Sequence, residues 1–448
     1  MTIPGRHRFH FLIWLAAWLI PWSGTPLLRA QGGRAAMKKM LLEREARYCD
    51  YRRERKDLTR GAFEVLRFPT GWTFQPRYKH DPKRKSRILN PDYYCTLCVA
   101  EGRIPDPGNR SSVRLAQRKE EDVLRWIREE LKIRKPAYLE DDSFKIFLDL
   151  PAMSTKRYPN RFLREELEQL HDVFPKISKK TTGLNPHQRL HLYRIRAHRL
   201  LRDFWWLAGT TEEELRARYP HMAGPYMGMK NKQEIFVFRK RKHFNRFLQW
   251  SIGVRTEAEG FCWHHHIDRA MMMVMFDSGE RDPSTQNFFL HRLMHNLVDA
   301  YRTYQYKLPA WIQMGIAHWV ERRETPRANA FCFSEGTTPE KMLETRWLPK
   351  VRKMVLKGDV PPLAQFAGVT EYGELPLSYH MVTYSLFSYL MSLGPEKFPV
   401  FLNILKEKRK GESLQSLQLR AFKKAYGLDL IRFDQGWREW VKLIYPSV

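Results

Sequence analysis

Two histidines, His291 and His295, stand four residues apart in a stretch whose apolar residues recur at helical spacing. On a helix, residues four apart lie on one face, so the two imidazoles point toward a common position. Two imidazoles in that arrangement can hold a zinc ion. Hydrolysis at such an ion also needs a carboxylate base beside the first histidine and a third ligand from a neighbouring helix. The region 291–321 is therefore a candidate metal site.

A second helix is predicted at residues 311–323, just after a break at Leu308 and Pro309. It contains Trp311, Ile312, Gly315 and Ala317, and position 314 is nineteen residues beyond His295. This block resembles the gluzincin metallopeptidases. In that family, HExxH is followed nineteen residues later by a glutamate ligand, commonly within the motif W-[LI]-x-E-G-x-A.

The resemblance extends over about residues 140–445 and is closest to bacterial exported gluzincin-like proteins. The segment GFCWHHHID corresponds to the substrate-edge strand of the family, and a helical tail ends in a W-x-x-W segment. The resemblance implies an α+β, gluzincin-like fold. Its mixed or antiparallel sheet and active-site-type helices would be followed by an all-helical C-terminal subdomain.

This sequence departs from the family at the two positions that carry the chemistry. Arg292 stands where the catalytic glutamate is expected, and Met314 stands where the glutamate ligand is expected. An arginine stays protonated and cannot accept a proton from a metal-bound water. Its charge 5 Å from a divalent ion would cost about 6 kcal/mol at an effective dielectric constant of about 20. A methionine thioether suits Cu(I) better than zinc. We therefore expect no catalytic residues at these positions.

Other histidines leave a rebuilt metal site open as an alternative. His318 on the second helix, or the run His264, His265 and His266, could join the pair at 291 and 295, and such a set would favour copper or nickel over zinc. In the edge strand, alternation places His264 and His266 on one face and His265 on the other. Glu321 lies about 10 Å along the helix axis from position 314.

The alternative without metal is that hydrogen bonds satisfy His291 and His295 in a polar pocket. Arg292 would then point to solvent or fill the space of the metal. In some relatives a tyrosine stabilises the oxyanion, and Tyr379 or Tyr384 could correspond to it. The methionines at positions 271–273 and 275 are expected to pack in a core.

The five cysteines are an odd number, so disulfides do not build this fold. Cys95 and Cys98 form a CxxC pair, and Cys49 and His80 precede it. These four residues could close a second, tetrahedral metal site. A local disulfide between Cys95 and Cys98 is the other possibility in an oxidising compartment.

The N-terminal 30 residues have the basic start and short apolar core of a signal peptide, which predicts an exported protein. No later stretch approaches the ~18 apolar residues of a membrane span. Lys and Arg number 78 against 49 Asp and Glu, for a net charge of +29. The basic runs are scattered and no nucleic-acid-binding motif accompanies them, so nucleic acid is an unlikely partner and anionic envelope polymers fit better.

We predict a signal peptide at 1–30, a basic accessory region at 31–135, a gluzincin-like α+β domain at 136–330 and a helical subdomain at 331–448. Strands are expected at 143–152 and 234–240, two more within 260–279, and helices at 112–134, 161–174, 185–209, 243–253, 285–305, 311–323, 377–393, 394–411, 413–427 and 433–445. The chain is predicted to be an exported gluzincin-like pseudopeptidase. It would need no cofactor, although zinc or another transition metal is possible, and would bind a peptide, a protein or an anionic envelope component. The alternative is an active metallohydrolase with a rebuilt His-rich site.

Overall fold

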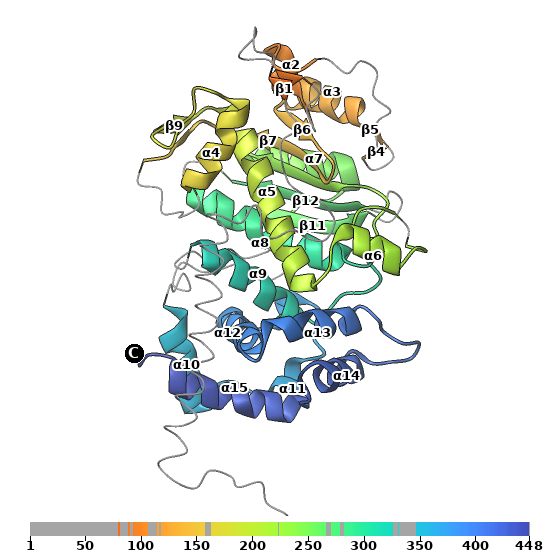
Figure 1. Ribbon diagram of the computed structural model, residues 1–448, viewed down its shortest axis with the longest axis vertical. Coiled ribbons are helices and arrows are strands. Elements are labelled where there is room, and N and C mark those ends of the chain that lie inside the picture. Colours follow the sequence, from red (N-terminus) through yellow and green to blue (C-terminus); the bar gives the residue numbers. More distant parts are fainter. Residues whose placement is uncertain are drawn as a thin grey trace, which may run out of the picture. The chain divides into compact units, whose positions relative to one another are not determined.

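The structure, a computed structural model, describes residues 79–80, 88–89, 93–105, 114–115, 118–156, 163–222, 224–265, 270–277, 282–325, 330 and 346–447 (Figure 1). The predicted signal peptide, Cys49, His266 and Cys332 lie outside these residues. The described residues all belong to one unit of the chain, residues 56–448.

A six-stranded mixed sheet forms the centre, in the order β11-β12-β10-β7-β6-β3. The three middle strands β12, β10 and β7 are parallel, and the outer strands pair antiparallel. The strands are β3 Tyr94–Cys95, β6 Tyr138–Glu140, β7 Phe144–Asp149, β10 Gln233–Phe238, β11 Gly260–His265 and β12 Ala270–Phe276. The mixed sheet and its helices confirm the predicted α+β class.

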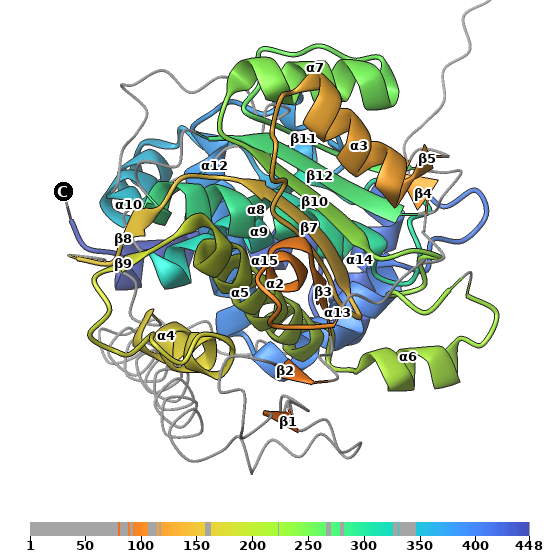
Figure 2. The same ribbon diagram turned by 90° about the horizontal axis from the view of Figure 1, so that it is seen from above.

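The middle strands are mostly apolar because both faces of the sheet are covered, and the buried Lys145 and Glu234 side chains in them lie 4.0 Å apart as an ion pair. On one face, α3 and α7 pack on a core with Ile127, Phe236 and Phe247, and on the other α5 contacts β7 and α8 contacts β12 (Figure 2). The methionines of β12 are buried, which confirms their predicted core role. Smaller strand pairs are β1 Lys79–His80 with β2 Ile88–Leu89, β4 Arg114–Leu115 with β5 Arg118–Lys119, and β8 Met153–Ser154 with β9 Gly183–Leu184.

Two long helices on the second face carry the candidate site. α5 begins with a capping box between Asn185 and Gln188 and ends at Gly209 in a left-handed conformation. α3 is shorter than the predicted helix at 112–134, because Arg114–Leu115 and Arg118–Lys119 pair with each other as strands before it. The helices of this part are α2 Thr96–Ala100, α3 Glu120–Glu130, α4 Leu163–Val173, α5 Pro186–Ala208, α6 Glu212–Arg218, α7 Arg241–Ile252, α8 Asp282–Ala300 and α9 Ala310–Glu324.

The C-terminal part is helical, as predicted, and α12 packs closely against α9 (Figure 1). Its elements are α10 Trp347–Lys357, α11 Leu363–Phe366, η3 Tyr372–Glu374, α12 Tyr379–Ser392, η4 Pro395–Lys397, α13 Phe398–Leu405, α14 Leu414–Tyr426 and α15 Leu430–Ile444. Trp437 and Trp440 are buried there, and Trp437 donates to the Ser385 hydroxyl at 2.9 Å. No helix among the described residues has the length and apolar character needed to cross a membrane.

Candidate functional site

The predicted pair His291 and His295 lies in the middle of α8, facing α9. Their Nε2 atoms are 3.2 Å apart and share a hydrogen bond. His291 Nδ1 lies 3.0 Å from a Glu321 carboxylate oxygen, and His295 Nδ1 lies 3.3 Å from the Gln313 side-chain oxygen. The earlier histidine therefore meets the later residue of α9, which means that the two helices run antiparallel.

This antiparallel pairing explains why Glu321, and not position 314, reaches the histidines. Glu321 lies two turns beyond position 314, while His291 lies one turn before His295. The Glu321 carboxylate bridges two imidazoles, at 3.0 Å from His291 Nδ1 and 2.8 Å from His318 Nδ1. The other nitrogen of His318 is 2.7 Å from His380 Nδ1 on α12. The polar cluster is thus centred further along α9 than the family pattern predicts.

The Glu321 cluster, defined as His291, His318, Glu321 and His380, is almost completely buried. The side chains of the first three have no exposed surface. Burial by itself would raise the pKa of the Glu321 carboxyl, but the neighbouring imidazoles of His318 and His291 lower it. The carboxylate is therefore held in its charged form by hydrogen bonds from within the protein. One ligand atom each from His291, His318 and Glu321 lie within 4.8 Å of one another, a spacing that could also hold a metal ion.

A tyrosine that the sequence did not single out lies beside His295, the other member of the histidine pair. The Tyr372 hydroxyl lies 3.0 Å from His295 Nδ1 and donates to the Gln313 side-chain oxygen. The two tyrosines suggested by the resemblance lie elsewhere: the ring of Tyr379 contacts Phe366, and that of Tyr384 contacts Trp347.

Arg292 is buried, so the alternative that it points to solvent is wrong. Its guanidinium packs against the backbone of Gly260 in β11, where a Cβ atom would overlap it, and lies 5.5 Å from the centre of the Phe288 ring. It therefore fills the space between α8 and the edge strand, beside the histidine pair. Met314 is also completely buried.

The histidine run lies apart from this cluster. His264 is in β11, on the side of α8, and its ring stacks on Tyr304 at 4.8 Å. His265 ends the strand with its side chain half-buried. The structure therefore does not bring the described members of the run together with His291 and His295 as metal ligands.

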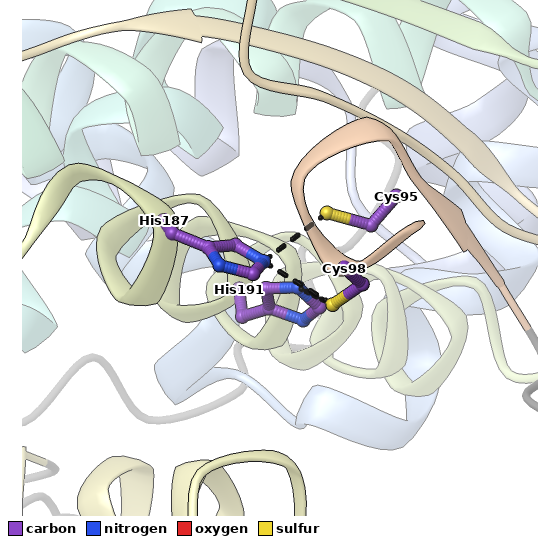
Figure 3. A group of neighbouring side chains, drawn as sticks. All are labelled: Cys95, Cys98, His187 and His191. Carbon is purple, nitrogen blue, oxygen red and sulfur yellow. Dashed lines mark hydrogen bonds between the residues drawn. The ribbon is translucent and has the colours of Figure 1, made fainter. Parts of the chain in front are cut away.

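Cys95 and Cys98 come together with residues that the sequence did not single out. Both cysteines are free thiols, and they face His187 and His191 of α5 (Figure 3). The predicted partners differ: His80 lies in β1, and Cys49 is outside the described residues. The sequence does contain a signal for this group: a CxxC pair, and two histidines four residues apart on a predicted helix.

We call Cys95, Cys98, His187 and His191 the Cys2His2 cluster. Nε2 of His187 lies 3.4 Å from Cys95 Sγ and 3.2 Å from Cys98 Sγ, and Nε2 of His191 lies 3.4 Å from Cys98 Sγ. All four side chains are buried. Burial by itself would raise the pKa of the Cys95 thiol, but hydrogen bonding to Cys98 and the charge of His191 lower it well below its usual range.

Buried ion pairs connect the helices that carry the two clusters. Asp282, at the start of α8, accepts hydrogen bonds from Arg189 at 2.6 Å, Arg196 at 2.8 Å and Tyr193 at 3.0 Å, all from α5. Arg196 also pairs with Glu166 of α4 at 3.2 Å. These charged groups are buried but paired, as stable interiors require.

No protein-family model matches this chain, and a search of curated proteins found no match. Any assignment of function therefore rests on the fold and on these two clusters.

Proposed function

We propose that this chain is an exported, non-catalytic protein with a gluzincin-like fold that binds an extended peptide segment along the edge strand β11. The order of elements supports the fold: an antiparallel pair β11 and β12, then α8 with its histidine pair, then α9 with the second motif, then the helical tail. Export rests on the signal-like residues 1–30 alone.

The proposal that the protein is non-catalytic rests on one observation: the Glu321 carboxylate bridges His291 and His318 beside the buried Arg292. The carboxylate already accepts hydrogen bonds from His291 and His318, so the polar groups of the cluster are satisfied without a metal ion. The residue next to His291 is a cation that cannot act as a base. The absence of exposed surface on His291, His318 and Glu321 leaves no approach for a scissile bond.

The binding part rests on β11. In the described sheet β11 is an end strand whose hydrogen-bonded neighbour is β12, so its other edge offers backbone groups to an added strand. Phe261 and Trp263 are half-buried against the core on one side, and Arg292 supports the strand at Gly260 on the other. A rigid edge loses little conformational entropy when a peptide binds. The net charge of +29 favours an acidic peptide over a basic one.

Fluorescein-labelled casein, an unfolded acidic protein, tests both parts of the proposal. We expect the chain to bind casein without cleaving it, with or without added zinc. Hydrogen exchange of the β11 amides should slow when casein binds, while the β3 amides at the opposite end of the sheet serve as the internal control. Unchanged β11 exchange in the complex would refute edge binding, and casein cleavage by wild type that is lost in His291→Ala would refute the non-catalytic assignment.

A second function is favoured by one observation, the 4.8 Å grouping of ligand atoms from His291, His318 and Glu321. Two imidazoles and a carboxylate with an open fourth position form a hydrolytic zinc set. This metallohydrolase alternative predicts that His318→Ala loses both a bound metal and any peptidase activity. Under the favoured proposal, His318→Ala changes neither.

A further inference from the structure

We infer that Cys95, Cys98, His187 and His191 bind one structural zinc ion, which fastens the segment around β3 and α2 to helix α5. This inference is independent of the proposed function. It rests on the geometry of the cluster, on its surroundings, and on what the site connects.

The spacing of the donor atoms fits tetrahedral zinc. With Zn–S bonds of about 2.3 Å and Zn–N bonds of about 2.05 Å, a tetrahedron places S and N about 3.6 Å apart. Three of the four S–N distances in the cluster are 3.4, 3.2 and 3.4 Å. Because all four ligand atoms lie within 4.8 Å of one another, an ion would need only small side-chain movements.

His187 is held in the orientation and tautomer of a metal ligand. Its Nδ1 lies 2.9 Å from the Glu101 carboxylate, to which it donates, and this leaves the Nε2 lone pair directed at the two sulfur atoms. A carboxylate behind a ligating histidine is the usual outer partner at zinc sites. Glu101 follows Cys98 by three residues, so the loop after the CxxC pair supplies it.

Aromatic rings pack against the two imidazoles, and the Tyr93 hydroxyl lies 4.0 Å from Cys98 Sγ. Phe174 packs edge-on against the His187 and His191 rings at 5.0 and 5.2 Å, and Tyr93 packs against His191 at 5.0 Å. Binding of Zn²⁺ would displace the protons of its ligands to solvent, and two thiolates with two neutral imidazoles give a site of zero net charge. A neutral site costs little to bury. With four protein ligands no position remains for water, which is typical of structural sites rather than catalytic ones.

The site connects parts of the chain that are far apart in sequence. The cysteines and the histidines are separated by 89 to 96 residues in the sequence. Besides the cluster, β3 is held by a two-residue pairing with β6 and by the Thr96 hydroxyl, which donates to the Pro136 carbonyl at 2.8 Å. The Tyr138 amide also donates to the Thr96 hydroxyl at 3.1 Å, and the Arg194 guanidinium lies 5.0 Å from the centre of the Tyr93 ring. A zinc ion that closes this long loop would add to the stability of the junction.

The test is the zinc content of the full chain, purified under a non-chelating reductant and without a histidine tag. We expect about one zinc per wild-type chain, unchanged in the control Cys262→Ser and lowered about tenfold or more in Cys98→Ser. His187→Cys should keep the ion because cysteine is also a ligand, whereas His187→Ala should lose it. Removal of zinc from wild type should lower the unfolding midpoint by roughly 10 °C.

A variant outside the buried cluster covers the case in which Cys98→Ser does not fold. The Glu101 side chain is 45% exposed, so Glu101→Ala should fold while weakening zinc affinity about 10- to 100-fold in competition with a chelator. Wild type without zinc, a Cys95–Cys98 disulfide in the reduced preparation, or zinc that stays in Cys98→Ser would overturn the inference. So would zinc that is lost from His291→Ala/His318→Ala and not from Cys98→Ser.

Discussion

Helices α5 and α8 each carry two histidines four residues apart, and the two pairs end in different surroundings. His187 and His191 lie near the start of α5, and their Nε2 atoms face the thiols of Cys95 and Cys98. His291 and His295 lie in the middle of α8, and their Nε2 atoms face each other at 3.2 Å. The same spacing thus gives a set of four converging ligands in one region and a hydrogen-bonded chain in the other.

The difference shows that spacing on a helix sets where imidazoles point but not what they meet. On α5 the opposing groups are thiols, which become anionic ligands when a metal displaces their protons. On α8 the nearest anion, Glu321, is already bound by two imidazoles, and the neighbouring residue is a buried cation, Arg292. A zinc ion is therefore favoured at the first pair and not needed at the second.

The largest expected effect comes from the ion pair that joins the two helices. Asp282→Ala would leave Arg189 and Arg196 of α5 with fewer buried partners, and we expect a loss of about 3–5 kcal/mol in the free energy of unfolding. Denaturant unfolding measures this loss, with the exposed Glu439→Ala as control, which should change little. An equal effect in the two variants would show that the helices are not joined through Asp282.

A smaller loss in the free energy of unfolding is expected when the Glu321 bridge between α8 and α9 is changed. Glu321→Gln removes the charge between His291 and His318 but keeps one acceptor and the side-chain volume, so we expect a loss of about 3 kcal/mol. The zinc content should stay as in wild type. Loss of a metal ion from Glu321→Gln would instead mean that both histidine pairs belong to metal sites.

The contact between Arg292 and the edge strand β11 should affect the free energy of unfolding less than the Glu321 bridge does. Gly260→Ala places a Cβ where the guanidinium lies, and the resulting overpacking should cost about 1–3 kcal/mol. Arg292→Ala should make the same glycine substitution nearly neutral, because the space is then free. Additive losses in the double variant would contradict the placement of Arg292 under β11.

The smallest and most gradual effect is a dependence on pH. Burial alone would raise the pKa of Glu166, but the guanidiniums of Arg196 and Arg199 lower it. A pKa lowered by folding means stability that is present above the unfolded value, near 4.3, and is lost as the pH falls below it. We expect Glu166→Gln to remove up to about 1.4 kcal/mol per pH unit of this acid dependence. The expectation is wrong if the free energy of unfolding, measured by denaturant titration, falls equally for wild type and Glu166→Gln between pH 5 and pH 3.

Much of the fold could be predicted from the sequence because periodicity reports burial. The strands β7, β10 and β12 are rich in buried apolar residues, and α8, α9 and α12 follow helical spacing, so each was expected close to its observed place. Helix α3 was predicted to begin at residue 112, but the structure pairs Arg114–Leu115 with Arg118–Lys119 as two short strands, and the helix begins after them.

The candidate sites were predicted only in part, because partners distant in sequence leave no periodic signal. Cys95 and Cys98 were predicted to form either part of a metal site or a disulfide, but their neighbours in the structure, His187 and His191, come from a helix about 90 residues later. For Glu321, helix geometry predicts a place two turns beyond position 314, and both residues lie on α9. What it could not give was the antiparallel offset of α8 and α9, which brings that carboxylate to His291.

The most direct test of this comparison is the zinc content of two double variants, His187→Ala/His191→Ala and His291→Ala/His295→Ala, measured beside wild type by mass spectrometry. Both remove the same groups at the same spacing, so each is the matched control of the other. We predict that the first variant loses about one zinc per chain and that the second retains it. Loss of zinc only from the second variant would contradict the account and would place the metal between α8 and α9.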